Sequence, residues 1–224
     1  MRNTRASIGL ALLAGICLAQ DSAPPSRPGR AIKVVLEIKD GDAWRAQDSR
    51  IVLRTNDEIR FRFNSSTGGY LYVFSIGSDG KNSWLFPRPA KAISRVEPGP
   101  DYVIPDQSSS LVIGGPPGYE VIYWVLSPAP LDGLAPATPP RGSQPNTLRP
   151  RCREEALQQR TCVDAHAGAG PVSNAGELPL SLGTGKDRLV ARSLSFSSEK
   201  NSDRITTPDS EPSVIVYEFR VAHN

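Results

Sequence analysis

The stretch DEIRFRFNSSTGGYLYVFSIGSDGKNSWLFP, from Asp57 to Pro87, decides the fold. Its opening IRFRFN alternates apolar and polar residues, which is the period-2 pattern of a half-buried strand. After a Gly-Gly break, Tyr70 to Ile76 is a dense run of β-branched and aromatic residues. The turn residues Ser78 to Gly80 then separate this run from Trp84 to Phe86. The stretch therefore predicts three consecutive antiparallel strands.

Comparable patterns on both sides extend this prediction to the rest of the chain. We expect further strands over 32–39, 102–105, 111–113, 119–126 and 213–221, with a short apolar run at 50–53. Frequent Gly and Pro turns between short strands favour a β-sandwich over a βαβ architecture. The predicted fold is an all-β, antiparallel, sandwich-like single domain. Its predicted core is Val34, Leu36, Ile59, Phe61, Phe63, Leu71, Val73, Phe74, Leu85, Val121, Tyr123, Val125, Ile215 and Phe219.

A long segment interrupts the pattern before the last strand. Seven prolines lie between Pro128 and Pro150 among small and polar residues, a composition that cannot bury a core. One short helix is expected over 151–160, and 197–213 is polar and expected to be mobile. The predicted organisation is a signal peptide at 1–19, a Pro-rich tether at 20–30, a β-sandwich core at 31–127, a Pro/Gly/Ser-rich insertion with a disulfide at 128–212, and a final core strand at 213–224.

The first nineteen residues have the features of a secretory signal peptide. Arg2 and Arg5 precede an apolar segment, 8–18, that is too short to span a bilayer. Cleavage after Ala19 would start the mature chain at Gln20 and leave 24 of the 26 basic residues against 23 acidic ones. We therefore expect export to the periplasm or the medium with no transmembrane segment. The near-neutral balance argues against nucleic-acid binding.

The cysteines fit an oxidising compartment. Cys152 and Cys162 are expected to form a disulfide once the leader has left. Free thiols and a metal site that adds His166 are the alternatives, although this set offers three ligands where structural zinc takes four. A lipid anchor on Cys17 is disfavoured because the bulky Ile16 precedes it.

Residues suited to catalysis are few. A serine triad needs a positioned histidine, and the chain has only His166, in a predicted loop, and His223, expected to be solvated. No Gly-x-Ser-x-Gly elbow occurs, and Gly183–Lys186 lacks the flanking residues of a phosphate loop. A hydrolase could use His166 or the carboxylates of Asp40 and Asp42, but Asp-Gly pairs are mostly turns. We expect no enzyme, no catalytic residue, no metal and no cofactor.

Aromatic residues are the strongest binding candidates. Tyr70, Tyr72, Trp84, Tyr102 and Tyr119 lie in the β region, where exposed rings can contact sugars or protein partners. Tyr70 and Tyr72 fall on the strand face opposite to their apolar neighbours. These five residues are the predicted partner-binding aromatics.

Several short blocks occur in order between Ile51 and Ser127 and again in the last strand. They are LRTNDEIRF at 53–61, GYLYVF at 69–74, SDG at 78–80, LFP at 85–87, DYVIP at 101–105, GPPGYE at 115–120 and YEFR at 217–220. Together these blocks resemble the bacterial domain of unknown function numbered 4384. The resemblance implies an exported β module or one attached to enzymatic or repeat domains, and it carries over no catalytic residue. This chain departs from multidomain members because it has no recognisable enzymatic neighbour.

The leading functional hypothesis is an exported, non-enzymatic β domain that binds a protein or glycan partner at the cell envelope. A structural role, with an edge strand pairing to another chain, is the second hypothesis. An envelope hydrolase is the third.

Overall fold

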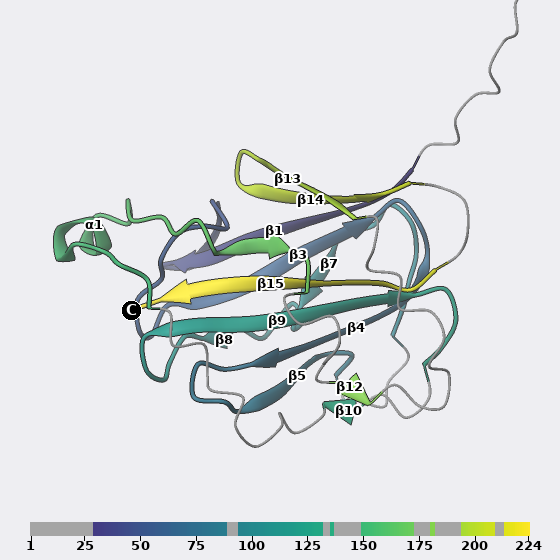
Figure 1. The fold of residues 1–224 in the computed structure, drawn as a ribbon, viewed down its shortest axis with the longest axis horizontal. Coiled ribbons are helices and arrows are strands. Elements are labelled where there is room, and N and C mark those ends of the chain that lie inside the picture. The colour runs from purple at the N-terminus through teal and green to yellow at the C-terminus, as the bar shows by residue number, and fades with distance from the viewer. Residues whose placement is uncertain are drawn as a thin grey trace, which may run out of the picture.

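The protein is a sandwich of two antiparallel β-sheets (Figure 1). This confirms the predicted fold class. The computed structural model describes residues 29–88, 94–131, 135–136, 149–172, 180–181, 194–208 and 213–224. The predicted signal peptide, most of the predicted tether and parts of the predicted insertion lie outside the described residues.

One sheet, here called the β1 sheet, is seven-stranded. It contains β1 (Arg30–Asp40), β2 (Ala43–Gln47), β3 (Glu58–Ser65), β7 (Tyr102–Ile104), β8 (Leu111–Val112), β13 (Ser195–Glu199) and β14 (Ser202–Thr207). The order is β13-β14-β1-β3-β7, with β2 paired to β1 and β8 paired to β3.

The other sheet, here called the β9 sheet, is six-stranded. It contains β4 (Gly69–Ile76), β5 (Asn82–Phe86), β6 (Arg95–Val96), β9 (Gly118–Ser127), β11 (Gly168–Gly170) and β15 (Ile215–His223). The order is β11-β15-β9-β4-β5, with β6 paired to β4, and Figure 1 shows β15, β9, β4 and β5 side by side. The remaining elements are β10 (Ala135–Pro136), its partner β12 (Leu180–Ser181) and α1 (Glu154–Gln158).

The core between the sheets is organised around Trp124 of β9, which is fully buried. Phe63 of β3 stacks on the indole with ring centroids 5.6 Å apart, and Tyr217 of β15 stacks on it at 5.9 Å. Phe61 meets it edge to face at 5.6 Å, which is a favoured geometry for aromatic pairs. Aromatic rings from both sheets therefore pack against the same side chain, Trp124.

The predicted core is correct along β1, β3 and β15 and wrong in part along β9. Trp124 and its neighbours of the same parity face the other sheet, whereas Val121 and Tyr123 are only half-buried and point outward with Val125. Both parities of YEVIYWVL are apolar, so alternation along this strand does not identify the inner face. Phe74 of β4 is buried as predicted, but it packs with Val125 on the outer side of the sheet rather than in the core between the sheets.

The polar segment 197–213 was expected to be mobile, and this expectation is wrong for 197–207. Its residues form most of the β13–β14 hairpin, whose second strand pairs with β1 from Thr207 opposite Arg30 to Asp203 opposite Val34. Ile205 is the buried apolar contact of β14. Backbone pairing to β1 therefore orders a segment that has few apolar residues and no clear strand pattern in its sequence.

The short helix α1 confirms the helix expected within 151–160, over five residues. No helix in the described parts of the chain is long and apolar enough to cross a membrane.

Candidate functional site

The outer face of the β9 sheet, which points away from the sandwich core, is aromatic. Along β4, Leu71 and Val73 contact the core, so Tyr70, Tyr72 and Phe74 point to the opposite side. Sequence alternation predicted this division for the tyrosines.

Three rings form a line across neighbouring strands, which we call the aromatic row. Phe74 is opposite Trp84 of β5 on one side and opposite Tyr123 of β9 on the other. Its ring stacks on Trp84 at 6.2 Å between centroids and on Tyr123 at 5.0 Å, with interplanar angles of 17° and 10°. Neighbouring strands are about 4.8 Å apart, too little for rings lying flat side by side. The rings therefore stand face to face and cover one another's faces.

Burial varies along the row and beside it. Phe74 is fully buried, whereas Trp84, Tyr123 and Tyr70 are half-buried. Tyr72 is only 8% exposed, and its hydroxyl accepts a hydrogen bond of 2.9 Å from the backbone N–H of Leu131. The stacking covers both faces of the Phe74 ring and one face each of Trp84 and Tyr123.

The row ends beside an ion pair. Glu218 of β15 is opposite Tyr123, and Arg220 Nε lies 2.7 Å from Glu218 Oε1. Burial, and then the charge of Glu218, raises the pKa of Tyr123 to about 12. The Tyr123 hydroxyl therefore stays protonated at physiological pH and can act as a donor.

Trp84 carries an unused donor at the other end. Within the described residues, its indole Nε1–H is buried and has no hydrogen-bond acceptor. A buried donor without a partner costs about 1–3 kcal/mol, so this indole N–H lowers the stability of the folded chain.

The structure brings three of the five predicted aromatics together and separates two. Tyr70, Tyr72 and Trp84 lie on the outer face described above. Tyr102 belongs to β7 of the other sheet, where it is half-buried and its hydroxyl accepts a 2.7 Å hydrogen bond from the Glu97 N–H.

Tyr119 does not belong to an exposed surface. It is 2% exposed and packs with Val52, Leu157 and Ala222 at the end of the sandwich. Burial and a hydrogen bond to Asp164 raise its pKa to about 12. The expectation that Tyr119 contacts a partner is therefore wrong.

Phe74 and Tyr123 complete the row, although sequence reasoning assigned both to the core. The signal for Phe74 was available, because it has the same parity as Tyr70 and Tyr72 on β4. For Tyr123 the signal is its register opposite Phe74, which only strand pairing reveals.

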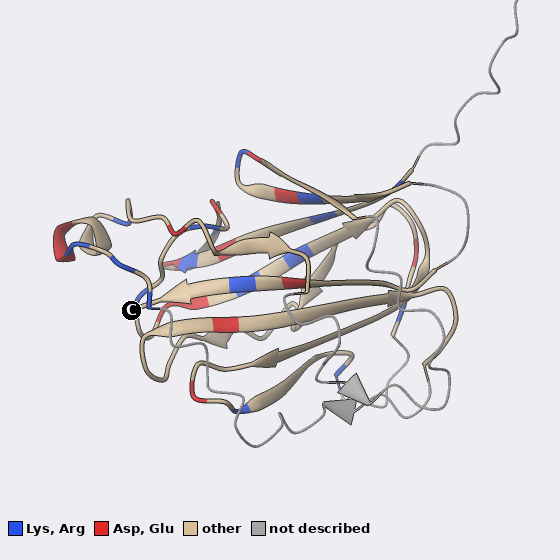
Figure 2. Cartoon of the chain, in the orientation of Figure 1, with Lys and Arg blue, Asp and Glu red and all other residues tan. Residues whose placement is uncertain are grey.

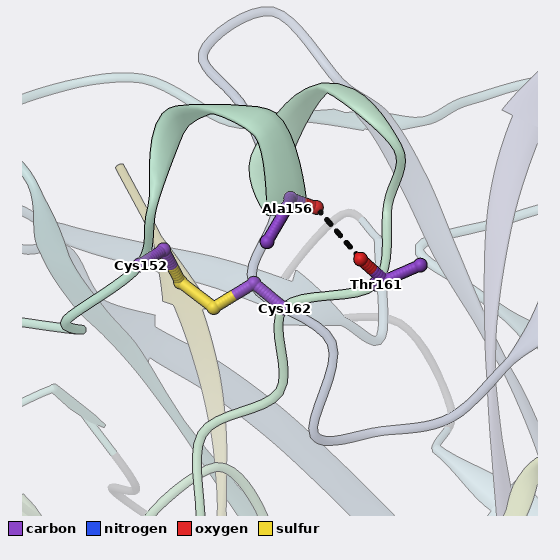
Figure 3. The surroundings of a disulfide bond; sticks show 4 residues. All are labelled: Cys152, Ala156, Thr161 and Cys162. Atoms are coloured by element: carbon purple, nitrogen blue, oxygen red, sulfur yellow. Dashed lines mark hydrogen bonds between the residues drawn. A yellow bond between two sulfur atoms is a disulfide. The ribbon is translucent and has the colours of Figure 1, made fainter.

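The disulfide predicted between Cys152 and Cys162 is present (Figure 3). It closes the loop around α1, where the Thr161 hydroxyl donates to the Ala156 carbonyl at 3.4 Å. The backbone N–H of Val52 donates to the Cys162 carbonyl at 3.0 Å, which ties the loop to the sandwich.

The residues considered for hydrolysis lie on separate segments. Asp40 and Asp42 are exposed at the β1–β2 turn, where Asp40 pairs with Arg45 at 2.7 Å. His166 is exposed, and its backbone N–H donates to Asp164 Oδ1 at 2.7 Å. In the described parts of the chain, no group of three His, Cys, Asp or Glu side chains is placed to hold a metal ion.

His223 was expected to be solvated, and this is wrong. It is fully buried at the end of β15, with Nε2 3.4 Å from Glu120 Oε1. Leu53 lies against this end of β15, because its N–H donates to the Ala222 carbonyl at 2.8 Å and its carbonyl accepts from the Asn224 N–H at 3.0 Å. The penultimate residue is therefore enclosed.

Residues 52–130 match the model of a family described as a domain of unknown function, DUF4384. The match agrees with the resemblance seen between Ile51 and Ser127. It contributes β3, β7 and β8 to one sheet and β4, β5, β6 and β9 to the other, including the whole aromatic row. No curated protein and no solved structure matches the chain.

Proposed function

We propose that this chain is an exported, non-enzymatic β-sandwich that binds a protein partner at the cell envelope through the outer face of the β9 sheet. The observation that carries the proposal is the aromatic row of Trp84, Phe74 and Tyr123, with Tyr70 and Tyr72 beside it. Large, rigid, partly exposed aromatic side chains are the residues that contribute most to protein interfaces.

The stacking favours a protein over a glycan. Sugars stack on open ring faces, but here the rings cover one another, and edges and hydroxyls remain accessible. A protein side chain can pack against ring edges, and a carbonyl of the partner can accept from the protonated Tyr123 hydroxyl.

Export is supported by two features. The first nineteen residues have the pattern of a signal peptide, and the Cys152–Cys162 disulfide suits an oxidising compartment.

The proposal is tested by affinity capture from an envelope extract of the source organism, with the chain from Gln20 onward as bait. Trp84→Ser and Tyr70→Ser each remove a half-buried ring from the proposed face. Tyr102→Ser is the matched control because Tyr102 is also half-buried but lies on the other sheet. We expect a captured protein to be lost from the first two baits and retained by the third, with circular dichroism showing that all are folded.

Equal capture by all baits would contradict the aromatic face as the binding surface. Purified peptidoglycan and polysaccharides are screened in parallel, and retention there with the same variant pattern would replace the protein partner by a glycan. The alternative is edge pairing between two copies of the chain, and β13 could pair in this way because it is the outermost strand of the β1 sheet. Sedimentation of the bait alone would detect the resulting oligomers.

A further inference from the structure

The outer face of the β1 sheet differs from that of the β9 sheet because it is charged. Strand register places Arg204 of β14, Lys33 of β1 and Asn64 of β3 in one cross-strand line. The neighbouring line holds Val35 and Arg62. Figure 2 shows basic positions on all three strands.

Part of this face surrounds a hollow of about 300 Å³. Its lining residues are Lys33, Val35, Arg62, Asn64 and Asp101. Such a volume accommodates one small group, and Val35 supplies an apolar contact among polar neighbours.

The Arg62 side chain is held in place from below. Glu37 is 1% exposed although it points away from the core, and it forms ion pairs with Arg62 and, at 2.7 Å, with Arg60. The Arg60 guanidinium also lies 4.3 Å from the centre of the Trp44 ring, a cation–π contact that helps to fix Arg60 beside Glu37. One positive charge at the hollow is therefore pre-positioned by a buried carboxylate.

Two further cations have no counter-ion among the described residues. Lys33 and Arg204 are both exposed, and neither forms an ion pair with a described carboxylate. The acidic residue of the hollow, Asp101, is already occupied, because it accepts from Asn64 Nδ2 at 3.1 Å and lies 3.9 Å from Arg62 Nη1. The hollow thus has an excess of positive charge, with one carboxylate at its edge.

We propose that this hollow binds the single anionic group, a carboxylate or a phosphate monoester, of a small hydroxylated solute such as a charged sugar. Lys33 and Arg62 contact the anion, and Arg204 adds long-range attraction. Although Asp101 already contacts Asn64 and Arg62, its carboxylate oxygens have further lone pairs that accept a hydroxyl of the ligand. Its charge disfavours solutes with more than one anionic group. This site is independent of the proposed partner-binding face, which lies on the other sheet.

The test is calorimetric titration of the chain from Gln20 onward with three probes built on one hexose: glucuronate, glucose 6-phosphate and uncharged glucose. We expect heat of binding with at least one charged probe, none with glucose, and weaker binding at high salt because exposed charges are screened. Binding of one charged probe alone identifies a carboxylate or a phosphate as the recognised group, and binding of both assigns a general anion site.

Two substitutions are expected to change the affinity for the charged probe in opposite directions. Lys33→Gln removes an exposed cation without an ion-pair partner and is expected to raise Kd about fivefold, a change equivalent to about 1 kcal/mol. Asp101→Asn removes the repelling charge and is expected to lower Kd. Lys200→Gln is the matched control, because Lys200 is exposed in the β13–β14 turn and does not line the hollow.

The proposal is overturned if neither charged probe binds, if glucose binds equally well, or if Lys33→Gln and Lys200→Gln have the same affinity. None of these variants touches the aromatic row, so a negative result here leaves the proposed partner-binding face intact.

Discussion

Glu37 shows how a single residue can escape the pattern of its strand. It falls at a polar, outward position of β1, yet it is among the most buried charged residues described. Arg60 and Arg62 of β3 form ion pairs with it, and the Arg60 guanidinium lies in turn over the Trp44 ring of β2. The carboxylate is thus desolvated by side chains rather than by the core, and its ion pairs offset that cost.

Two glutamates on this face offer a direct comparison of buried and exposed ion pairs. Glu37→Gln is expected to lower the free energy of unfolding by about 1–3 kcal/mol, because it leaves Arg60 partly buried without its counter-charge. Glu58→Gln breaks the exposed pair with Lys39, which measures 3.0 Å, and is expected to cost less than about 1 kcal/mol. Urea denaturation of both variants measures the difference, and equal losses would refute the buried role of Glu37.

At the scale of elements, the loop around α1 is ordered mainly by its contacts with the sandwich. The helix has five residues and no side-chain hydrogen bond at its N-cap, so it is marginal by itself. Arg160, which follows it with φ of 54°, forms two hydrogen bonds with the Asp57 carboxylate at 2.8 and 3.0 Å. Leu157 is buried against Val52 and Tyr119. The disulfide closes the same loop.

The double substitution Cys152→Ser and Cys162→Ser is expected to lower the free energy of unfolding by about 2–3 kcal/mol, mostly by loosening the unfolded chain. Thermal melting with and without reductant measures this effect. Reductant should lower the melting temperature of the wild type but not of the variant. A wild type that melts at the same temperature in both conditions would show that contacts alone hold the loop.

At the scale of the whole molecule, three of the six tyrosines have raised pKa values and stay protonated well into the alkaline range. Tyr217 lies in the core between the sheets, Tyr123 on the outer face and Tyr119 at the end of the sandwich. Burial raises the pKa of Tyr119 and Tyr123 to about 12 and raises that of Tyr217 well above its ordinary value of 10.0. Each of these three parts of the fold therefore holds a tyrosine hydroxyl that resists deprotonation.

This predicts alkaline destabilisation. Unfolded tyrosines lose their protons near pH 10 while the folded ones retain them, so the free energy of unfolding falls as pH rises from 10 towards 12. The expected loss is about 1 kcal/mol per pH unit for each raised tyrosine, and all of this stability is present below pH 10. Tyr123→Phe should make the fall shallower. Tyrosinate absorbance follows the titration, and ionisation of all six tyrosines in one step near pH 10 would contradict the prediction.

The alternating strands were predictable because in each of them every second residue is apolar, the residues between are mostly polar, and a clear turn lies at each end. β1 and β3 are of this kind, and their core residues are as expected. β9 is not, because both of its parities are apolar, and Trp124 was therefore left out of the predicted core. β13 and β14 carry serine, threonine and charge, so their membership of the β1 sheet had no signal in the residues themselves.

The candidate site shows the same limit. Alternation could assign Tyr70 and Tyr72 to the face of β4 opposite Leu71 and Val73, but it could not decide which of the two faces points outward. Tyr119 could not be excluded, because its burial depends on Leu157 and the disulfide loop, far along the chain. The hollow on the β1 sheet was not visible either, since Lys33, Arg62 and Asp101 come from separate strands and loops.

The amino-acid sequence by itself determined the strand class, the turns, the cysteine pair and the family resemblance, because period-2 alternation, turn chemistry and short motifs are local properties. Only the tertiary structure decided which face of β9 is inner, that Glu37 and His223 are enclosed, and that Trp84, Phe74 and Tyr123 share a line. Register and burial depend on partners distant in sequence, and a strand that is apolar on both faces gains its orientation from the sheet that packs against it.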